Sequence, residues 1–350
     1  MFSKKVISLD MGSANIKIAI GRYKGKYVLV EDLKTISTPE NSIDDGKIVN
    51  REDVEFSLKH FLKEKDIQKS EVICTLKSKS IINREFLLPM AKEDELLKMA
   101  KIEAQQYIPI VLDEYIIQYK LLEKINIDGM EKARILVVAI NRDIVDTYFD
   151  LLKSLTLKPV ALDINANGVM KIFGQDVLIN QSEFTTQKTI AYIDIGAETI
   201  DINILSSGIY QFSKILDMGS RDIDIAIAKA FNVSLLQGQE IKKKKIFSNS
   251  DVNTIDILKN IVYTVISNWL REIDKIFKYY SSRKIENIID TIYLYGGGSK
   301  ILGIEEQFSK YLNIDTFKIK NISNIKKDKC VNNIDLDYYL NAIAAIKRLK

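Results

Sequence analysis

The sequence has few of the residues that bind transition metals or form disulfide bonds. Its 350 residues include two cysteines, Cys74 and Cys330, and a single histidine, His60. So few thiol and imidazole groups exclude a Cys/His metal site and indicate a reducing compartment. A thiol nucleophile remains an alternative on these grounds, and two partly buried structural cysteines are the simpler interpretation.

Long apolar runs and clusters of charge are also missing. No uninterrupted apolar run approaches the roughly 18 residues of a membrane-spanning helix, and the residues before Asp10 lack the apolar stretch of a signal peptide. We therefore expect a cytoplasmic protein. Lysine and arginine number 51 against 47 aspartate and glutamate, for a formal net charge of +4, and the basic residues are scattered except over 242–245. This pattern gives no indication of nucleic-acid binding.

The length and composition fit a folded protein of more than one domain. At 350 residues, 46% of them hydrophobic and 28% charged, the chain exceeds the size at which a single core stops growing. Apolar periodicities of two and of three to four residues both occur, which predicts a mixed α/β architecture. The expected strands cover 6–9, 16–20, 26–33, 71–76, 81–90, 115–122, 133–140, 159–163, 190–195, 200–205, 208–217 and 291–295, and the expected helices 52–65, 93–109, 142–155, 166–173, 222–231, 254–280 and 301–312.

The last segment, residues 336–350, is apolar on one side and ends in basic residues. It fits either a final core helix, whose C-terminus suits basic residues, or an amphipathic membrane anchor. Because the segment is short and begins with two acids, we favour the core helix. Residues 41–50 and 319–333 are polar and are expected to be loops.

One short pattern occurs twice along the chain. Residues 8–17 read SLDMGSANIK, and residues 192–201 read YIDIGAETID. In both copies an apolar strand ends in an acid and a glycine, and apolar residues then resume at period two, which predicts a β-hairpin with a polar tip. A single D-x-G tip also fits an ordinary turn. Its recurrence favours a common function for the two hairpins.

The tip of the first hairpin carries groups that suit a small anion. Gly12 lets the backbone approach a ligand closely, Ser13 adds a hydroxyl group and Lys17 a positive charge. Asp10 would repel a phosphate directly, so we expect it to hold a Mg2+ ion through water. A third signal is the run Gly296-Gly297-Gly298 between an apolar strand and a helix, where a base or a phosphate can approach the backbone.

The two hairpins and the glycine turn together resemble the actin, Hsp70 and sugar-kinase superfamily of ATP-binding proteins. The resemblance implies an α/β, actin-like (ribonuclease H-like) fold of duplicated domains around a nucleotide cleft, with ATP and Mg2+ as ligands. It also implies a role for each residue at the site. The first phosphate loop would comprise Asp10, Gly12, Ser13, Asn15 and Lys17, the second would comprise Asp194, Gly196 and Thr199, and Asp10 and Asp194 would hold Mg2+ through water. Glu240 and Lys243 would contact the ribose and base, Gly296, Gly297 and Gly298 would form the adenosine turn, and Asp163 would position the attacking water. For Glu240 and Lys243, an exposed ion pair is the alternative.

The segment over 81–157 narrows the resemblance. It contains REFLLP at 84–89, EDEL at 93–96, EAQQYIP at 103–109 and DE at 113–114, which resemble the PilM family of type IV pilus assembly and, more loosely, FtsA of cell division. Four residues depart from the family pattern. Asn15 and Ala197 are not decisive, whereas Gln239 precedes Glu240 where an alanine is usual and the acidic Glu198 lies inside the second phosphate loop.

The resemblance to this family implies a domain organisation and a partner. Subdomain 1A would comprise residues 1–80, 158–187 and 331–350, with an inserted α+β subdomain 1C at 81–157. Residues 188–330 would form the second domain (2A), with a subdomain 2B at about 222–282. Such proteins bind ATP, hydrolyse it slowly at most, and hold the N-terminal cytoplasmic tail of PilN in the groove between subdomains 1A and 1C. The resemblance thus implies a location at the cytoplasmic face of the inner membrane, where the chain is peripheral and attached through its partner. It also implies indirect contact with PilO and the pilus assembly ATPase, and a role in twitching motility.

Two other functions remain as alternatives. A small-molecule kinase of the same superfamily would need a catalytic base, which Asp163 or Asp201 could supply, but no sugar-binding cluster is recognisable. An FtsA-like protein that polymerises beneath the membrane would need an amphipathic tail beyond the core. Self-association and the resident nucleotide are left open by the sequence.

Overall fold

The structure is a computed structural model that describes residues 4–65, 67, 69–107, 111–173, 177–183, 188–243, 252–284 and 286–347, with Glu183 and residues 252–255 described by their backbone only. The chain divides into two compact units. The first unit comprises Lys5–Ile18 and Lys34–Asn165, and the second comprises Met1–Lys4, Ala19–Leu33 and Ala166–Lys350. The subdomain boundaries expected from the sequence stay a prediction.

A six-stranded mixed sheet contains the first hairpin. Its strand order is β10-β6-β1-β2-β3-β18, and β2 and β3 each run through both units. Three parallel strands place their C-terminal ends in register, because Asp10 on β1 and Asp163 on β10 both pair with Thr75 on β6. The strands are β1 (Val6–Met11), β2 (Asn15–Tyr23), β3 (Val28–Ser37), β6 (Glu71–Leu76), β10 (Lys158–Ile164) and β18 (Ile325–Lys327).

Two amphipathic helices of the first unit, α1 (Arg51–Glu64) and α3 (Arg142–Ser154), begin at side-chain caps. Asn50 accepts a hydrogen bond from the Asp53 N–H, and Asn141 accepts one from the Asp143 N–H, so each asparagine satisfies a backbone donor that the first turn leaves unpaired. The apolar stripe of each helix is buried. It comprises Val54, Leu58, Phe61 and Leu62 on α1 and Ile144, Tyr148, Leu151 and Leu152 on α3.

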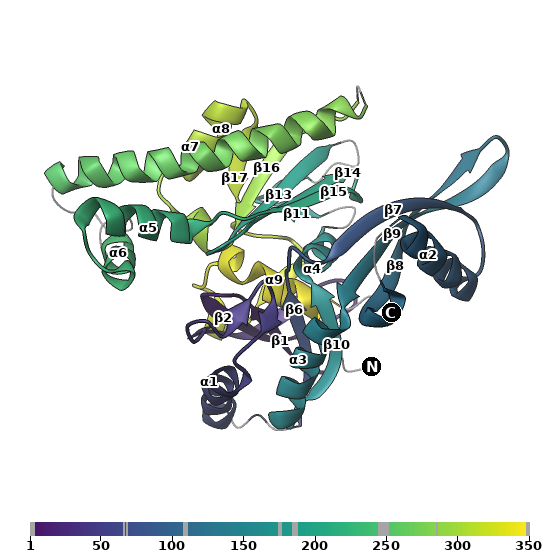
Figure 1. Ribbon diagram of the computed structural model, residues 1–350, viewed down its shortest axis with the longest axis horizontal. Helices are drawn as coiled ribbons and strands as arrows, with labels where there is room; N and C mark the ends of the chain where they lie inside the picture. The colour runs from purple at the N-terminus through teal and green to yellow at the C-terminus, as the bar shows by residue number, and fades with distance from the viewer. Residues whose placement is uncertain are drawn as a thin grey trace. The chain divides into compact units, whose positions relative to one another are not determined.

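The segment over 82–141 forms a three-stranded antiparallel sheet with one helix (Figure 1). Its strand order is β7-β9-β8, from β7 (Ile82–Pro89), β8 (Tyr115–Ile127) and β9 (Met130–Asn141), and α2 (Glu93–Tyr107) packs Leu96, Ala100 and Ala104 into the same apolar core. The β8–β9 hairpin is longer than expected from the sequence. Asp128 and Gly129 both adopt positive φ, which makes the two-residue turn that an Asp-Gly pair favours, and this turn lets the strands extend to it.

The second hairpin lies in a five-stranded sheet of the second unit, in the order β15-β14-β13-β16-β17. Helices α7 and α8 lie over one face of this sheet (Figure 1) and share its apolar core. Trp269 of α7 is 1% exposed within that core, which confirms the long helix as a core element. The elements are β13 (Thr189–Ile195), β14 (Ile200–Ser206), β15 (Ile209–Leu216), α5 (Ser220–Phe231), α6 (Leu235–Ile241), α7 (Val252–Ser282), β16 (Thr291–Tyr295), a 3-10 turn at Gly297–Lys300, α8 (Ile304–Leu312) and β17 (Asp315–Lys318).

The final helix, α9 (Leu336–Ile346), is a core element. Leu340 and Ile343 are fully buried, and Ala344 packs near Gly168 of α4 (Asn165–Ile172). A membrane anchor needs an apolar face that is open to lipid. The core interpretation of this segment is therefore confirmed for the described residues through Lys347, and the anchor interpretation is wrong. None of the described helices is long and apolar enough to span a membrane.

Some short elements were not expected from the sequence. The polar stretch 41–50 contains the two-residue strands β4 (Ile43–Asp44) and β5 (Lys47–Ile48), and the stretch 319–333 contains β18. Two or three residues are too few to show a period, and β18 is held by its pairing with β3. Two further short strands are β11 (Leu178–Ile179) and β12 (Ser182–Glu183).

The two cysteines have different environments. Cys74 is fully buried and Cys330 is exposed, so the expectation that both are partly buried is wrong. Burial raises the pKa of the Cys74 thiol to about 12, which leaves almost no thiolate at neutral pH and makes this group a poor nucleophile.

Candidate functional site

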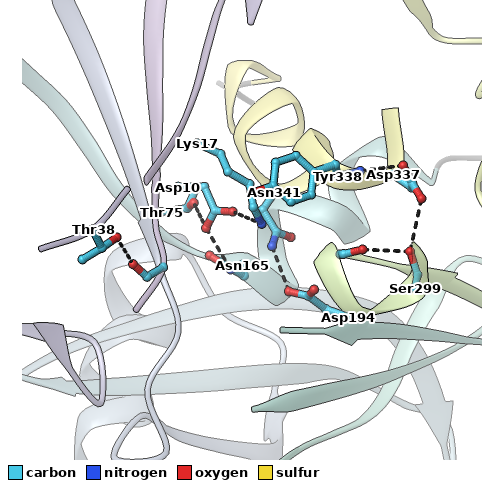
Figure 2. Close-up of polar contacts among 12 residues, drawn as sticks. Asp10, Lys17, Thr38, Thr75, Asn165, Asp194, Ser299, Asp337, Tyr338 and Asn341 are labelled. Atoms are coloured by element: carbon cyan, nitrogen blue, oxygen red, sulfur yellow. Dashed lines mark hydrogen bonds and ion pairs between the residues drawn. The ribbon is translucent and has the colours of Figure 1, made fainter. Parts of the chain in front are cut away.

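In the first unit, three donors surround the carboxylate of Asp10, which is 3% exposed at the end of β1. Lys17 Nζ lies 3.3 Å from Oδ2, Asn165 Nδ2 donates to Oδ1 at 3.3 Å, and Thr75 Oγ1 donates to Oδ1 at 3.5 Å (Figure 2). A buried carboxylate needs such partners because desolvation disfavours its charge. Lys17 therefore contacts Asp10, and its predicted role in a phosphate loop stays a prediction.

The tip of the first hairpin is fixed by Thr38. The Thr38 hydroxyl donates to the Gly12 carbonyl at 2.7 Å (Figure 2), and the Thr38 N–H donates to the Ala14 carbonyl at 3.1 Å. A Cβ atom on Gly12 would lie 2.8 Å from the Asn15 carbonyl oxygen, so the tight tip itself requires glycine. Ser13 and Asn15 are half-buried at this tip.

Asp163 is the third acid expected at the carboxyl end of a strand in this unit. It is half-buried, and its Oδ1 accepts the N–H of Ile164 at 2.9 Å. Its register with Thr75 places its backbone two strands, or about 10 Å, from that of Asp10. The sequence analysis did not identify Asn165 and Thr75, which both contact the Asp10 carboxylate directly.

In the second unit, Asp194 repeats the arrangement at the end of β13. It is 2% exposed, and Asn341 of α9 donates to its Oδ2 at 3.0 Å (Figure 2). Like Asn165, Asn341 is 3% exposed, and the Oδ1 atoms of both side chains have no hydrogen-bond partner among the described residues. At each D-x-G hairpin, a buried asparagine from a helix thus donates to a buried aspartate, and the Oδ1 atom of that asparagine has no partner among the described residues.

The second loop, Gly196–Thr199, is closed by its own backbone and by the start of α5. Gly196 N–H donates to the Thr199 carbonyl at 2.9 Å, and the N–H groups of Ser220 and Arg221 donate to the carbonyls of Gly196 and Ala197 at 3.0 and 2.8 Å. These bonds satisfy two of the donors that a helix start leaves open. The start of α5 therefore holds the loop in one conformation.

The three glycines of the turn after β16 differ in what they contact. Gly296 has φ +87°, and a Cβ atom there would lie 2.1 Å from Asp194 Oδ1; a Cβ on Gly298 would lie 2.2 Å from the Ile195 side chain. Packing against the second hairpin therefore requires glycine at both positions. A Cβ on Gly297 would meet only the Tyr338 ring, at 3.4 Å, so Gly297 is the glycine that internal packing does not explain.

The start of α9 fastens this turn. Gly296 N–H donates to the Asp337 carbonyl at 3.1 Å, and the Ser299 hydroxyl donates to the Asp337 carboxylate at 3.1 Å (Figure 2). Burial raises the pKa of Asp337, although the Ser299 bond and Lys300 oppose the shift. The sequence analysis placed this helix in the core without detecting that its polar residues contact the candidate site.

The ribose and base contacts expected of Glu240 and Lys243 stay a prediction. Glu240 lies on α6, which ends at Ile241, and Lys242 and Lys243 continue it in a wider, π-type turn; Glu240 and Lys243 are both exposed. The buried lysine is Lys242, whose Nζ lies 2.7 Å from Asp224 Oδ1 and donates to the Ser220 carbonyl at 3.0 Å. Because Lys242 and Lys243 are neighbours in a run of lysines, only their position around the helix distinguishes the buried one from the exposed one. The rest of the run, 244–245, lies outside the described residues.

The oxygen groups at each hairpin suit a hydrated magnesium ion better than a directly ligated metal. Among the described residues no group of three or more His, Cys, Asp or Glu side chains could hold a metal ion. Mg2+ keeps several waters and is usually bound through one or two carboxylates and substrate phosphates. At the first hairpin, the Asp10 carboxylate and the unpaired Asn165 amide oxygen are hard oxygen groups of the kind that such a hydrated ion needs. At the second hairpin, Asp194 and Asn341 offer the same pair of groups.

Comparison with solved structures identifies the fold. The chain is similar to a chain of a PilM-PilN type IV pilus biogenesis complex, at 19% identity and a TM-score of 0.82, over 99% of this chain and 100% of that one. It is also similar to the ethanolamine utilization protein EutJ from Carboxydothermus hydrogenoformans (13% identity, 99% and 90% covered, TM-score 0.57). A third similar structure is MreB5 of Spiroplasma citri bound to ADP (14% identity, 91% and 92% covered, TM-score 0.54). The actin-like α/β fold predicted from the sequence is confirmed.

The family follows from a match that extends over most of the chain. The model of the family described as type IV pilus assembly protein PilM matches residues 8–345. This range includes both D-x-G hairpins, the segment over 82–141 and the glycine turn. The chain belongs to the PilM family of type IV pilus assembly proteins.

Proposed function

We propose that this chain is an ATP-binding adaptor at the cytoplasmic face of the inner membrane, where it holds the N-terminal tail of PilN during type IV pilus assembly. Membership of the PilM family supports the role in pilus assembly. The likeness in fold to a chain of a PilM-PilN complex supports PilN as the partner, and the likeness to MreB5 bound to ADP supports a nucleotide as the ligand.

The repeated pairing of a buried aspartate with a buried asparagine carries the proposal for ATP. Asp10 with Asn165, and Asp194 with Asn341, each end a D-x-G hairpin at 3.3 and 3.0 Å. Burying two such polar pairs without full hydrogen bonding disfavours folding. At each hairpin, phosphates, Mg2+ and ordered water brought by a ligand would satisfy the amide oxygen that the protein leaves unpaired.

The roles proposed for the site follow from the chemistry of each group. The backbone of the two loops, with Ser13 and Thr199, would hydrogen-bond phosphate oxygens, and Gly297 would lie against the adenosine. Bound Mg2+ would supply positive charge to the phosphates. Asp163 would position a water molecule, because its half-buried carboxylate group lies at the same end of the parallel strands as Asp10. We propose slow hydrolysis at most, so that the nucleotide acts mainly on conformational populations.

The PilN tail is proposed to bind by the inserted segment, in the groove between subdomains 1A and 1C. Two exposed apolar side chains belong to this segment: Tyr107, the last residue of α2, is 52% exposed and Val111 is 60% exposed. Arg84 lies over the Tyr107 ring, 5.3 Å from its centroid, and donates to the Tyr107 carbonyl at 2.9 Å. An apolar rim with an ordered guanidinium suits a short amphipathic peptide. PilO and the assembly ATPase would be contacted indirectly, through PilN.

A charge introduced at this rim tests the partner. Val111→Asp is expected to weaken binding of a peptide from the PilN tail by at least about tenfold, because an exposed apolar contact would become a desolvated carboxylate. Fluorescence anisotropy with a labelled peptide measures this, with and without ATP and Mg2+.

The matched control is Ile288→Asp, because Ile288 is 65% exposed and lies in the second unit. This variant should bind the peptide as the wild type does. If wild-type protein fails to bind the peptide, or if both variants bind it equally well, the proposed partner surface is wrong.

A further inference from the structure

We propose that Arg221 is a positioning residue of the second phosphate loop, which neutralises Glu198 and thereby allows an acidic loop to accept phosphate. The inference rests on the proposed nucleotide binding and names a determinant of it that lies outside the D-x-G pattern. Glu198 lies inside the loop, between Gly196 and Thr199, where its negative charge would oppose a polyphosphate. Its carboxylate forms an ion pair with the Arg221 guanidinium.

The backbone fixes Arg221 beside the loop. Its N–H donates to the Ala197 carbonyl at 2.8 Å, one residue before Glu198. Gly219, which precedes α5, packs so closely that a Cβ atom there would lie 2.5 Å from the Ala197 carbonyl oxygen and 2.9 Å from the Glu198 nitrogen. Helix α5 therefore cannot shift away from the loop without breaking these contacts.

The start of α5 is in turn fixed from its own side. Asp222 Oδ2 accepts the Gly219 N–H at 3.0 Å and the Trp269 indole N–H at 3.3 Å. Trp269 is 1% exposed in the core of the second unit. These contacts fix the backbone of α5 at Arg221, next to the loop. The guanidinium therefore loses little conformational entropy when it pairs with Glu198, which favours a persistent ion pair.

The ion pair contributes little to the stability of the fold, so we expect it to act mainly on the affinity of the loop for its ligand. The side chains of Arg221 and Glu198 are 47% and 38% exposed, and exposed ion pairs stabilise proteins only slightly. An unpaired carboxylate within a phosphate loop, by contrast, acts on each charge of a bound polyphosphate. The first loop uses the same device, because Lys17 pairs with Asp10 there.

A double-mutant cycle distinguishes neutralisation from direct binding of phosphate by the guanidinium. Mg-ATP is titrated by calorimetry into the full chain as wild type, Arg221→Ala, Glu198→Gln and the double variant. Arg221→Ala should weaken binding about tenfold, Glu198→Gln should leave it unchanged or tighten it, and the double variant should return to within about threefold of wild type. Arg22→Ala is the matched control, because Arg22 pairs with Glu31 at 2.6 Å elsewhere in the second unit, and it should keep wild-type affinity.

Three results would overturn the inference. A double variant as weak as Arg221→Ala would mean that the guanidinium binds phosphate itself, and an unchanged Arg221→Ala would mean that the pair has no effect on the ligand. Absence of ATP binding by the wild type would refute the proposed nucleotide binding, and this inference with it. Binding by the wild type with the wrong pattern among the variants refutes the inference alone.

Discussion

Asp224→Ala is expected to lower the free energy of unfolding by about 3–5 kcal/mol, because it leaves the Lys242 ammonium buried without its counter-charge. The side chains of Lys242 and Asp224 are 9% and 7% exposed, with Nζ and Oδ1 2.7 Å apart. Burial lowers the pKa of Lys242 and raises the pKa of Asp224, against their mutual attraction. Removal of one partner from a buried pair is costly because the charge that remains is desolvated and no longer compensated.

Urea denaturation of matched variants measures this effect. Asp274→Ala removes the carboxylate of an exposed pair with Lys278 at 2.6 Å and should change the free energy of unfolding by less than about 1 kcal/mol. The double variant Asp224→Leu with Lys242→Met should recover most of the stability that Asp224→Ala loses. Equal effects of Asp224→Ala and Asp274→Ala would show that the Lys242 pair is not buried as described.

Substitution of the three turn glycines is expected to separate folding from ligand binding. Gly296→Ala should cost about 2–4 kcal/mol, because it combines a left-handed backbone with a Cβ atom 2.1 Å from Asp194 Oδ1. Gly298→Ala should cost about 1–3 kcal/mol through its clash with Ile195. Gly297→Ala should leave stability unchanged or raise it by up to about 1 kcal/mol, since its Cβ would lie in ordinary contact with Tyr338.

Thermal unfolding of the three variants, followed by circular dichroism, tests this order. Gly297→Ala serves as the control for the other two, because it makes the same chemical change in the same turn. If Gly297→Ala destabilises the chain as strongly as Gly296→Ala, the assignment of Gly297 to the ligand loses its basis.

Much of the fold could be predicted because its signals are local. The alternation of apolar residues on either side of Asp10 and Asp194 specifies the two hairpins, and the strand over Thr291–Tyr295 was predicted with its observed bounds. The 3.6-residue period likewise located the long helix α7. Short edge elements such as β18 could not be predicted, since partners far along the chain hold them in place.

Contacts between residues far apart in the sequence also account for the parts of the candidate site that could not be predicted. Asn165 and Asn341 contact the two aspartates from helices that are 155 and 147 residues away in the sequence, and nothing in their local sequence indicates such a contact. Lys242 could not be distinguished from Lys243, because the choice depends on one residue of helix phase. The position of Glu198 was visible in the sequence, whereas its partner Arg221 became visible only with the start of α5 packed on the loop.

The most direct test of the account is a calorimetric titration of Mg-ATP into the full chain and into Asp10→Ala and Gly297→Val, each checked for folding by circular dichroism. We predict that the wild type binds ATP in a Mg2+-dependent manner and that each variant, still folded, binds it at least about 30-fold more weakly. Failure of the wild type to bind, or wild-type affinity in both folded variants, would contradict the account.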